Sequence, residues 1–388
     1  MQTENKVKSK GILFIESSIL PSRGGVPRVS WLLSNSFKES GYDVCFAFWL
    51  KDYEKVPLSN KIKYNERDSE EELKNKFSKI VAHCNVKFII CQNAFSTKIQ
   101  HVLLFLKKTY HCSIISCLHI NPGFEKYRET KKSKLQLIKN FIKRVFFPLR
   151  IKNMYREFYN LSDKFVLLSD SYIEDFLKLN NINDPHKLCS IANPLTFEDS
   201  ISEEEITHKK NQVLIITRLE EVQKNIKSAL RIWKNVEESG KANDWNLILG
   251  GYGPDEHETL EYAKELGLYN FRFIGKVEDA QKWYKESKIF MMTSRYEGFP
   301  MTILETVQNA CIPFAYDSYS SVHDIIQNGQ NGFLIKNNDE QSYANTILKI
   351  MGDEKELQRM AINALESSKQ FSVSTITSKW LALFEELK

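Results

Sequence analysis

The stretch "IFMMTSRYEGFPMTILE", residues 289–305, contains the pattern that decides the fold. Its first residues are mostly large and apolar, which is typical of a buried strand. The chain then turns through 295–299, and Pro300 suits the first position of a helix because its missing N–H would be unpaired there anyway. The sequence therefore predicts a strand, a short loop and a helix, with Glu297 just ahead of the helix and Glu305 inside it.

Short apolar runs of this kind alternate with helical patterns along the whole chain. Continuous apolar strands with helices between them are typical of parallel sheets that are covered on both faces. Two successive series of such runs predict two doubly wound, Rossmann-like α/β domains. The expected strands span residues 11–17, 42–49, 86–92, 112–119, 164–169 and 187–194 in the first series, and 212–219, 245–251, 271–277, 289–294, 312–317 and 332–335 in the second.

A polar, acid-rich stretch at 195–211 separates the two series. We therefore expect a first domain over 1–195, a second over 196–370, and a C-terminal helix within 371–388 that packs back on the first domain. In open parallel sheets, ligands bind beyond the carboxyl ends of the strands. Functional residues are accordingly expected in the strand-to-helix loops of both domains.

The composition is that of an ordinary globular protein, with 42% hydrophobic and 27% charged residues and a formal net charge of +5. Seven cysteines without CxxC spacing predict reduced thiols rather than a disulfide framework or a zinc site. The apolar runs are too short to span a bilayer, and the N-terminus does not have the layout of a signal peptide. These features predict a cytoplasmic protein.

One basic segment leaves two interpretations open. Residues 131–152 are rich in lysine and arginine, and Ile138, Phe141, Ile142 and Val145 recur at helical spacing within them. A basic amphipathic helix of this kind can lie on an anionic membrane surface. An ordinary surface helix with solvated lysines has the same composition.

The expected helix start after Pro300 is also a candidate anion site. The N–H groups of Met301 and Thr302 lack helical partners there, and the helix dipole favours negative charge. Glu297 and Glu305 can accept hydrogen bonds from hydroxyl groups on either side. A sugar nucleotide, with a diphosphate between two sets of hydroxyls, fits this arrangement.

The stretch "EGFPMTILE" resembles the Glu-seven-residues-Glu motif of the retaining glycosyltransferases of family 4. Further resemblances to that family follow in the right order over nearly the whole chain, at "SRGGVPR" (22–28), "ITRLEEVQKN" (216–225), "GGYGP" (250–254), "FIGKV" (273–277) and "QNGQNGFLI" (327–335). The resemblance implies the GT-B fold, in which two Rossmann-like domains face each other across a cleft.

The resemblance implies roles for the acidic and basic residues of the second domain. Arg218 and Lys224 match the pair that binds the donor diphosphate and stabilises the leaving group. Glu305 matches the glutamate that binds the ribose hydroxyls, and Glu297 matches the one beside the donor sugar. Preorganised cations lower the barrier to a step that builds negative charge on a diphosphate, so the physical chemistry agrees with this assignment.

The resemblance also implies donor contacts elsewhere in the chain. His119 matches a histidine beside the donor sugar. The backbone of Val277 matches the group that pairs with the base. The loops and the helix start that complete the donor site are Gly24, Gly25, Gly251, Gly298, Phe299, Pro300, Met301 and Thr302.

One departure from the family concerns the end of the helix that contains Glu305. Ala310 stands where the family usually has glycine. A residue other than glycine in the left-handed conformation costs about 1 kcal/mol, so we expect this helix to end differently.

The sequence thus predicts a retaining hexosyltransferase that moves a sugar from a nucleotide diphosphate, with UDP favoured by family habit, to a glycan or polyprenol-linked acceptor in cell-surface polysaccharide synthesis. The chain contains no Asp-x-Asp triplet, which favours a metal-independent reaction without a cofactor, and no nucleic-acid partner is expected. A GT-B sugar-nucleotide epimerase or phosphorylase, and a non-catalytic nucleotide-sugar-binding partner of a transferase, are the alternatives.

Overall fold

The computed structural model describes residues 10–388 apart from 21–23, 50–59, 66, 94 and 124–149. The chain divides into two compact units. Among the described residues, unit 1 contains 10–123, 150–196 and 373–388, and unit 2 contains 197–372. Each unit is built around its own parallel sheet.

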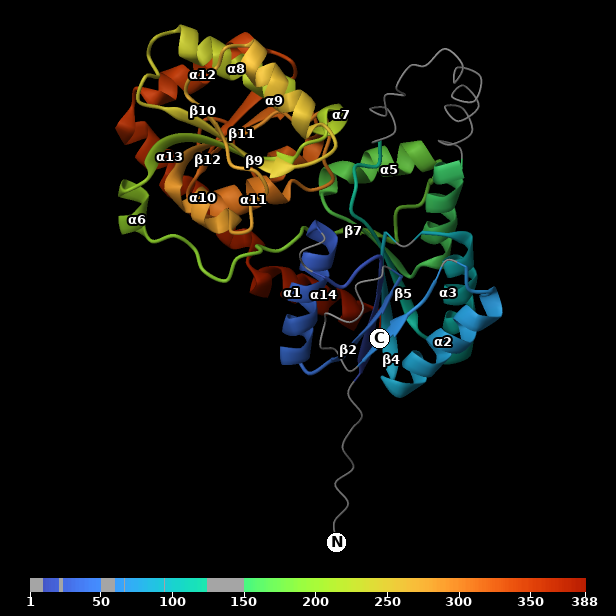
Figure 1. Cartoon of the computed structure of the whole chain (residues 1–388). Helices are drawn as coiled ribbons and strands as arrows, with labels where there is room; N and C mark the ends of the chain where they lie inside the picture. The colour runs from blue at the N-terminus through green and yellow to red at the C-terminus, as the bar shows by residue number, and fades with distance from the viewer. Residues whose placement is uncertain (1–9, 21–23, 50–59, 66, 94, 124–149) are drawn as a thin grey trace, which may run out of the picture. The chain divides into compact units, whose positions relative to one another are not determined.

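The sheet of unit 1 has seven strands in the order β3-β2-β1-β4-β5-β6-β7, and every pairing is parallel. Figure 1 labels β2, β4, β5 and β7 of this sheet. The order reverses between β1 and β4, so the topological switch point of this unit lies between these two strands. The strands are β1 (Gly11–Glu16), β2 (Asp43–Phe48), β3 (Lys61–Lys63), β4 (Val86–Gln92), β5 (Ser113–Leu118), β6 (Lys164–Leu167) and β7 (Leu188–Ser190).

Helices cover both faces of this sheet. Strand residues alternate between the faces, so Phe14 packs against Phe37 of α1 while its neighbour Ile15 joins the core with Phe77 of α2. Phe37 also contacts Phe384 of the C-terminal helix α14, with ring centroids 5.2 Å apart. The helices of unit 1 are α1 (Gly25–Glu39), α2 (Glu70–His83), α3 (Thr97–Tyr110), α5 (Ile173–Asn180), α14 (Val373–Glu386) and the 3-10 helix η5 (Asp170–Tyr172), and residues 150–161 are also helical.

The sheet of unit 2 has six parallel strands in the order β10-β9-β8-β11-β12-β13. Here the order reverses between β8 and β11, which places the switch point of unit 2 between them. The strands are β8 (Lys210–Arg218), β9 (Asn246–Tyr252), β10 (Phe271–Phe273), β11 (Ser287–Met292), β12 (Ile312–Asp317) and β13 (Phe333–Lys336).

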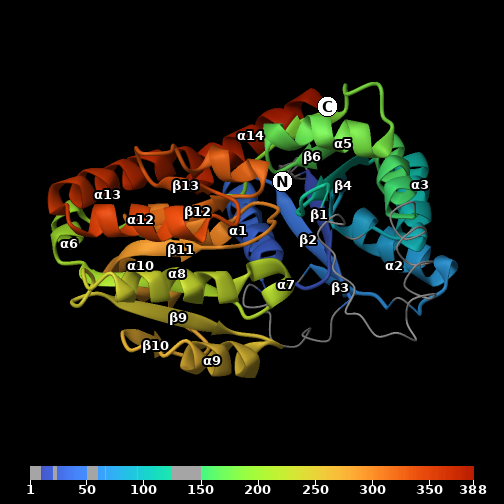
Figure 2. The ribbon, with the colours of Figure 1, turned by 90° about the horizontal axis from the view of Figure 1, so that it is seen from above.

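Unit 2 likewise has helices on both faces of its sheet. Ile289 and Met291 of β11 share a core with Trp233 of α8, whereas Phe290 packs against Tyr284 of α10. Helix α8 lies beside α12 (Figure 2), and the contacts along the chain place α11 beside α13. The helices are α6 (Glu203–Thr207), α7 (Glu221–Lys224), α8 (Ile226–Glu238), α9 (Glu256–Glu265), α10 (Ala280–Glu286), α11 (Met301–Gln308), α12 (Glu340–Met351), α13 (Glu354–Ser368), η6 (Ser320–Asp324) and η7 (Lys369–Phe371).

The predicted fold class is confirmed, since each unit is a doubly wound α/β sheet and all the expected strands are present. The sequence reasoning missed β3, which pairs with the edge of β2. This strand is three residues long and its single apolar residue, Ile62, stands between two lysines, so it carries no alternating pattern.

None of the helices in the described residues has the length and apolar character that crossing a bilayer requires. The basic segment 131–152 lies outside the described residues except for its last three positions, which begin the helix at 150–161.

Candidate functional site

The switch point of unit 2 brings two loops together. After β8, the chain forms the short helix α7 (Glu221–Lys224), and after β11 it passes through 293–300 to reach α11. Asn225 ends α7 in the left-handed conformation, with φ 52°, and α8 starts directly after it. Asparagine tolerates this conformation better than most residues, so the sharp turn between the two helices is built into the sequence.

An ion pair joins these two loops. Lys224 Nζ lies 2.6 Å from Glu297 Oε1, and the two side chains are 16% and 11% exposed. The other carboxylate oxygen of Glu297 accepts a hydrogen bond of 3.2 Å from Gln223 Nε2. Both oxygens therefore receive donors from α7. Lys224 and Glu297 were predicted from the sequence, but Gln223 was not. Its position next to Lys224 was the only feature of the sequence that pointed to it.

Arg218 occupies a different environment at the end of β8. Its side chain is 67% exposed, and its Nε lies 3.4 Å from Glu220. In the described part of the chain, no hydrogen bond or ion pair joins Arg218 to Lys224 or Glu297. Of the two predicted diphosphate-binding cations, Arg218 is therefore the one that faces solvent.

Helix α11 holds the second glutamate. Glu305 is 6% exposed, and its Oε2 accepts a hydrogen bond of 3.2 Å from Tyr284 Oη. The helix begins at Met301, one residue later than predicted, because Pro300 is its N-cap. The N-cap residue Pro300 supplies no side-chain hydrogen bond to this helix start, where the sequence predicts an anion site.

The end of α11 corrects one expectation. Ala310 adopts the left-handed conformation with φ 50°, so the helix ends in the way a glycine would allow, and the expectation of a different ending is wrong. Ala310 is fully buried in the core of unit 2. Packing of its methyl group offsets backbone strain of about 1 kcal/mol.

Close packing of strands accounts for the glycines at the end of β9. A Cβ at Gly251, whose φ is 147°, would lie 1.8 Å from the carbonyl oxygen of Thr217. A Cβ at Gly250 would lie 2.5 Å from the side chain of Val277. Glycine is thus required here by the protein itself, so these residues alone do not indicate a ligand.

Gly24 in unit 1 differs from these strand glycines. It has φ 149°, and a Cβ built on it would meet no described atom within 4 Å. Gly25, which follows it, is the first residue of α1. The conformation explains why glycine stands at position 24, and the open space leaves room for a ligand.

His119 follows β5 and is held by two consecutive residues, Gln92, which ends the neighbouring strand β4, and Asn93, which follows it. Its backbone N–H donates to Asn93 Oδ1 at 2.9 Å, and its ring Nε2 contacts Gln92 Oε1. Burial lowers the pKa of His119 to about 4, so the imidazole is neutral at pH 7. The contact with an amide oxygen favours hydrogen on Nε2. Gln92 and Asn93 were not nominated from the sequence, although they stand at a strand end.

Glu16 is a further buried acid at the switch point of unit 1. It ends β1, and the parallel register that pairs Ile15 with Cys91 puts it beside Gln92 on the neighbouring strand. Burial raises the pKa of its carboxyl well above the usual range, and among the described residues neither carboxylate oxygen has a hydrogen-bond partner. The sequence offered one signal that we did not use, an acidic residue within an apolar strand.

Unit 1 also contains a cavity of about 420 Å³ at the carboxyl ends of β2, β3 and β4. Its wall includes the aromatic side chains of Trp49, Tyr64 and Phe95 and the polar side chains of Asn93 and Lys98. A pocket that combines aromatic faces with hydrogen-bonding groups suits a small polar ligand. In the described residues, no group of three or more His, Cys, Asp or Glu side chains is placed to hold a metal ion.

Part of the chain is similar to a known family of proteins. Residues 196–367 match the model of the family described as "Glycosyl transferases group 1". The amylovoran biosynthesis glycosyltransferase AmsD of Erwinia amylovora is 24% identical over 93% of this chain and 96% of its own length. A relative from Campylobacter jejuni, named "GalNAc-alpha-(1->4)-GalNAc-alpha-(1->3)-diNAcBac-PP-undecaprenol alpha-1,4-N-acetyl-D-galactosaminyltransferase", is 29% identical over 51% of this chain and 54% of its own.

Solved structures agree on the fold. HepE of Anabaena, in complex with UDP, superposes with a TM-score of 0.74 at 17% identity and covers 97% of this chain and 100% of its own. A sucrose-phosphate synthase from Thermosynechococcus elongatus gives a TM-score of 0.75 at 16% identity, over 97% and 99% of the two chains. These structures show that the chain has the GT-B fold, and residues 196–367 are similar to the glycosyl transferases of group 1.

Proposed function

We propose that the chain is a retaining, metal-independent hexosyltransferase of family 4 that moves a sugar from a UDP-sugar to a glycan or lipid-linked glycan acceptor in cell-surface polysaccharide synthesis. The observation that supports this most strongly is the Lys224–Glu297 pair at the switch point of unit 2. It stands next to the start of α11, whose N-cap residue, Pro300, has no side chain that could cap the helix. A diphosphate can bind at the start of α11 while the sugar accepts and donates hydrogen bonds beside the carboxylate of Glu297.

The proposed chemistry assigns separate tasks to the charged groups. Bond cleavage builds negative charge on the departing diphosphate, and Arg218 and Lys224 stabilise that charge. Glu297 is held by Lys224 and Gln223 before any ligand arrives, so it needs no reorganisation to contact the sugar. In the scheme that the family resemblance implies, the acceptor hydroxyl attacks from the face that the diphosphate leaves, and the leaving phosphate takes its proton.

The donor assignment rests on buried polar groups of unit 2. Glu305 is fixed by Tyr284 and is placed in the proposal to accept hydrogen bonds from the ribose hydroxyls. The backbone of Val277, just beyond β10, is assigned to the base. The choice of UDP is supported by relatives of the same fold, since HepE was solved with UDP-glucose and the pneumococcal O-GlcNAc transferase GtfA with UDP and GlcNAc.

Unit 1 is proposed to bind the acceptor. Its cavity of about 420 Å³ combines aromatic faces, which pack on the C–H faces of sugar rings, with amide and hydroxyl groups that bind sugar hydroxyls. His119 is retained as a proposed sugar contact in its neutral form. The domain limits of 1–195, 196–370 and 371–388, a cytoplasmic location and membrane contact through 131–152 also remain proposals.

Incubation of the purified chain with a panel of nucleotide sugars and candidate acceptors tests the function. We expect one UDP-sugar to raise the melting temperature, and UDP release to require an acceptor and to continue in EDTA. Nucleotide release without a modified acceptor, or binding without any release, would contradict the transferase proposal. Epimerisation of the free donor would point to the epimerase alternative.

A further inference from the structure

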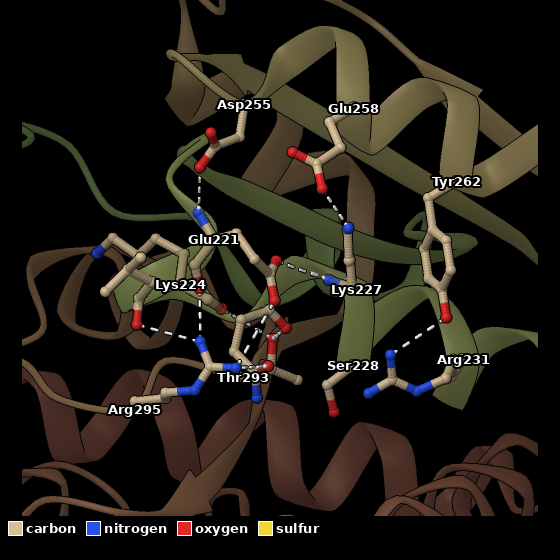
Figure 3. A network of polar contacts seen from close by, with 12 residues as sticks. Glu221, Lys224, Lys227, Ser228, Arg231, Asp255, Glu258, Tyr262, Thr293 and Arg295 are labelled. Carbon is tan, nitrogen blue, oxygen red and sulfur yellow. Dashed lines mark hydrogen bonds and ion pairs between the residues drawn. The ribbon is translucent and has the colours of Figure 1, made fainter. Parts of the chain in front are cut away.

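Helix α7 contains four residues, so it cannot satisfy its own last carbonyl groups. Arg295, in the loop after β11, donates to the carbonyl oxygens of three α7 residues, of which Glu221 also accepts from the amide of Asn225 (Figure 3). Its Nη1 donates to the carbonyl oxygens of Glu221 at 2.5 Å and Val222 at 3.1 Å. Its backbone N–H donates to the carbonyl oxygen of Gln223 at 2.8 Å.

Thr293 completes the set. Its Oγ1 lies 3.1 Å from the carbonyl oxygen of Lys224 and 3.0 Å from that of Asn225. The carbonyl oxygens of five consecutive residues, 221–225, are therefore contacted by two residues of the facing loop. Arg295 Nη2 also donates to Asn225 Oδ1 at 2.7 Å, which holds the side chain of the left-handed turn.

Glu221 extends this contact to the rest of the sheet edge. Its backbone N–H donates to Asp255 Oδ2 at 2.8 Å, beyond β9, and its carboxylate accepts from the backbone N–H of Lys227 at 3.0 Å, in the first turn of α8. The same carboxylate lies 3.7 Å from Arg295 Nη2. The chain segments that follow β8, β9 and β11 thus share one polar network (Figure 3).

This network sets the geometry of the candidate site. A helix of four residues is not stable alone, yet α7 carries Gln223 and Lys224, which bind the two oxygens of Glu297. Glu297 in turn stands two residues after Arg295. The distance between Lys224 and Glu297 therefore depends on how Arg295 fixes α7.

We propose that Arg295 is a positioning residue that holds α7 against the loop after β11 and so keeps Lys224 and Glu297 in register for the donor. The expected effect of Arg295 on turnover rests on the proposed function, whereas its expected effect on α7 does not depend on any substrate. Arg295 acts through Lys224, because its guanidinium contacts are with α7 and the turn that ends it.

The planar guanidinium is needed for this task. Its two terminal nitrogens reach two carbonyl oxygens and one amide oxygen at once. A lysine ammonium keeps the charge but offers a single head group, so it cannot reproduce the fork. The charge-conserving variant therefore separates positioning from simple electrostatics.

The test compares Arg295→Gln and Arg295→Lys with Arg231→Gln as a matched control. Arg231 binds Glu340 on α12 through Nε and Nη2, with a shortest distance of 2.5 Å, and takes no part in the contacts with α7. We expect both Arg295 variants to lower kcat about 100-fold, with the donor KM changed about 5-fold or less, because a misplaced catalytic group costs about this much. We expect kcat and the donor KM of Arg231→Gln to stay within about 2-fold of the parent, because the partners of Arg231 are Glu340 and Tyr262 and not α7.

Hydrogen exchange gives a readout that does not depend on turnover. The amide of Lys224 donates to the carbonyl oxygen of Glu220, and that of Asn225 donates to the carbonyl oxygen of Glu221. We expect these two amides to exchange at least about 10-fold faster in both Arg295 variants and at the parent rate in Arg231→Gln. Unchanged exchange across 221–225 would overturn the proposal even if the chain proves to be a transferase.

Chemical rescue provides the last discrimination. Arg295→Ala leaves space for a guanidinium ion. We expect guanidinium at tens of millimolar to restore the exchange protection of the Lys224 and Asn225 amides, and to restore kcat if the parent shows turnover. Sodium at the same ionic strength is expected to restore neither. Equal effects of the two salts would overturn the proposal. If the parent shows no transfer with any donor, the function fails while the exchange and rescue results still decide the role of Arg295.

Discussion

Lys224 and Glu297 form an ion pair of 2.6 Å between the loops that leave β8 and β11, and both side chains are largely buried. Parallel strands with a reversal of order bring such loops together at one edge of the sheet. The pair therefore stands where the topology of unit 2 places a ligand, and each partner offsets the cost of burying the other's charge in addition to its proposed chemistry.

Lys224→Met separates these two contributions when it is combined with Glu297→Leu. The single substitution leaves a buried carboxylate without its cation, and we expect it to lower the free energy of unfolding by about 3 kcal/mol. The double substitution removes both charges and is expected to regain most of that loss, whereas transfer activity stays absent. Urea unfolding and turnover assays on the four proteins of the cycle measure both. Activity in the double variant would contradict the assignment of Lys224.

Glu305→Ala is expected to act on donor binding. The side chain is buried and fixed by Tyr284, and loss of hydrogen bonds to a charged group costs about 1.5–3 kcal/mol, or roughly 10-fold to 100-fold in affinity. We expect the donor KM to rise by this factor with kcat little changed. Tyr284→Phe, which removes one hydrogen bond to Glu305, should produce a smaller rise. A fall in kcat at unchanged KM would contradict the ribose-binding role.

Arg218→Ala is expected to act on turnover. Because the side chain is 67% exposed, its removal should leave the free energy of unfolding within about 0.5 kcal/mol of the parent. Loss of one preorganised group from a charged transition state should lower kcat by about 100-fold. Steady-state kinetics and thermal unfolding check the two expectations. Unchanged kcat would show that the diphosphate does not depend on this residue.

Glu16→Gln is expected to stabilise the protein at alkaline pH. Burial raises the pKa of Glu16 in the folded state, so the folded state binds more protons than the unfolded state above the usual glutamate pKa. The free energy of unfolding should therefore fall as pH rises from about 4.5, by up to about 1.4 kcal/mol per pH unit, until the folded-state pKa is passed.

The neutral glutamine removes this dependence. We expect Glu16→Gln to unfold at a higher denaturant concentration than the parent at pH 8, with a smaller difference at pH 5. Glu39→Gln, at an exposed position of α1, should show little change at either pH. An equal shift at both pH values would contradict a buried, titrating carboxyl.

His119→Gln tests the opposite pH dependence, in which burial of a group lowers stability as pH falls. The folded-state pKa of His119 is about 4, below the usual 6.5, so the unfolded state binds more protons between these values. Stability is therefore lost as pH falls from about 6.5 to about 4, by up to about 3 kcal/mol. The free energy of unfolding of the variant should therefore depend less on pH over this range than that of the parent. His83→Gln, at an exposed position of α2, serves as the control and should keep the parent's dependence.

The sequence predicted those parts of the structure that depend on local pattern. The strands that become β8 and β11 are continuous apolar runs, and the turn before α11 was recognised because Gly298 and Pro300 interrupt such a pattern. The residues Lys224, Glu297 and Glu305 were nominated through motif spacing. The short edge strand β3 had no comparable pattern and was missed.

Residues whose role depends on tertiary partners could not be predicted in this way. Arg295 is one arginine among many until the fold places α7 opposite it, and Gln92 gains its role from the adjacent strand that carries His119. Ala310 was misjudged because the benefit of packing its methyl group in the core is not visible in the local sequence.

The anomeric configuration of the transferred sugar tests the central claim most directly. NMR of the product formed from an α-linked UDP-sugar should show an α linkage to the acceptor, formed by the parent protein, lost in Lys224→Met and retained in the control Arg231→Gln. A β-linked product, or an α-linked product formed equally well without Lys224, would contradict the account.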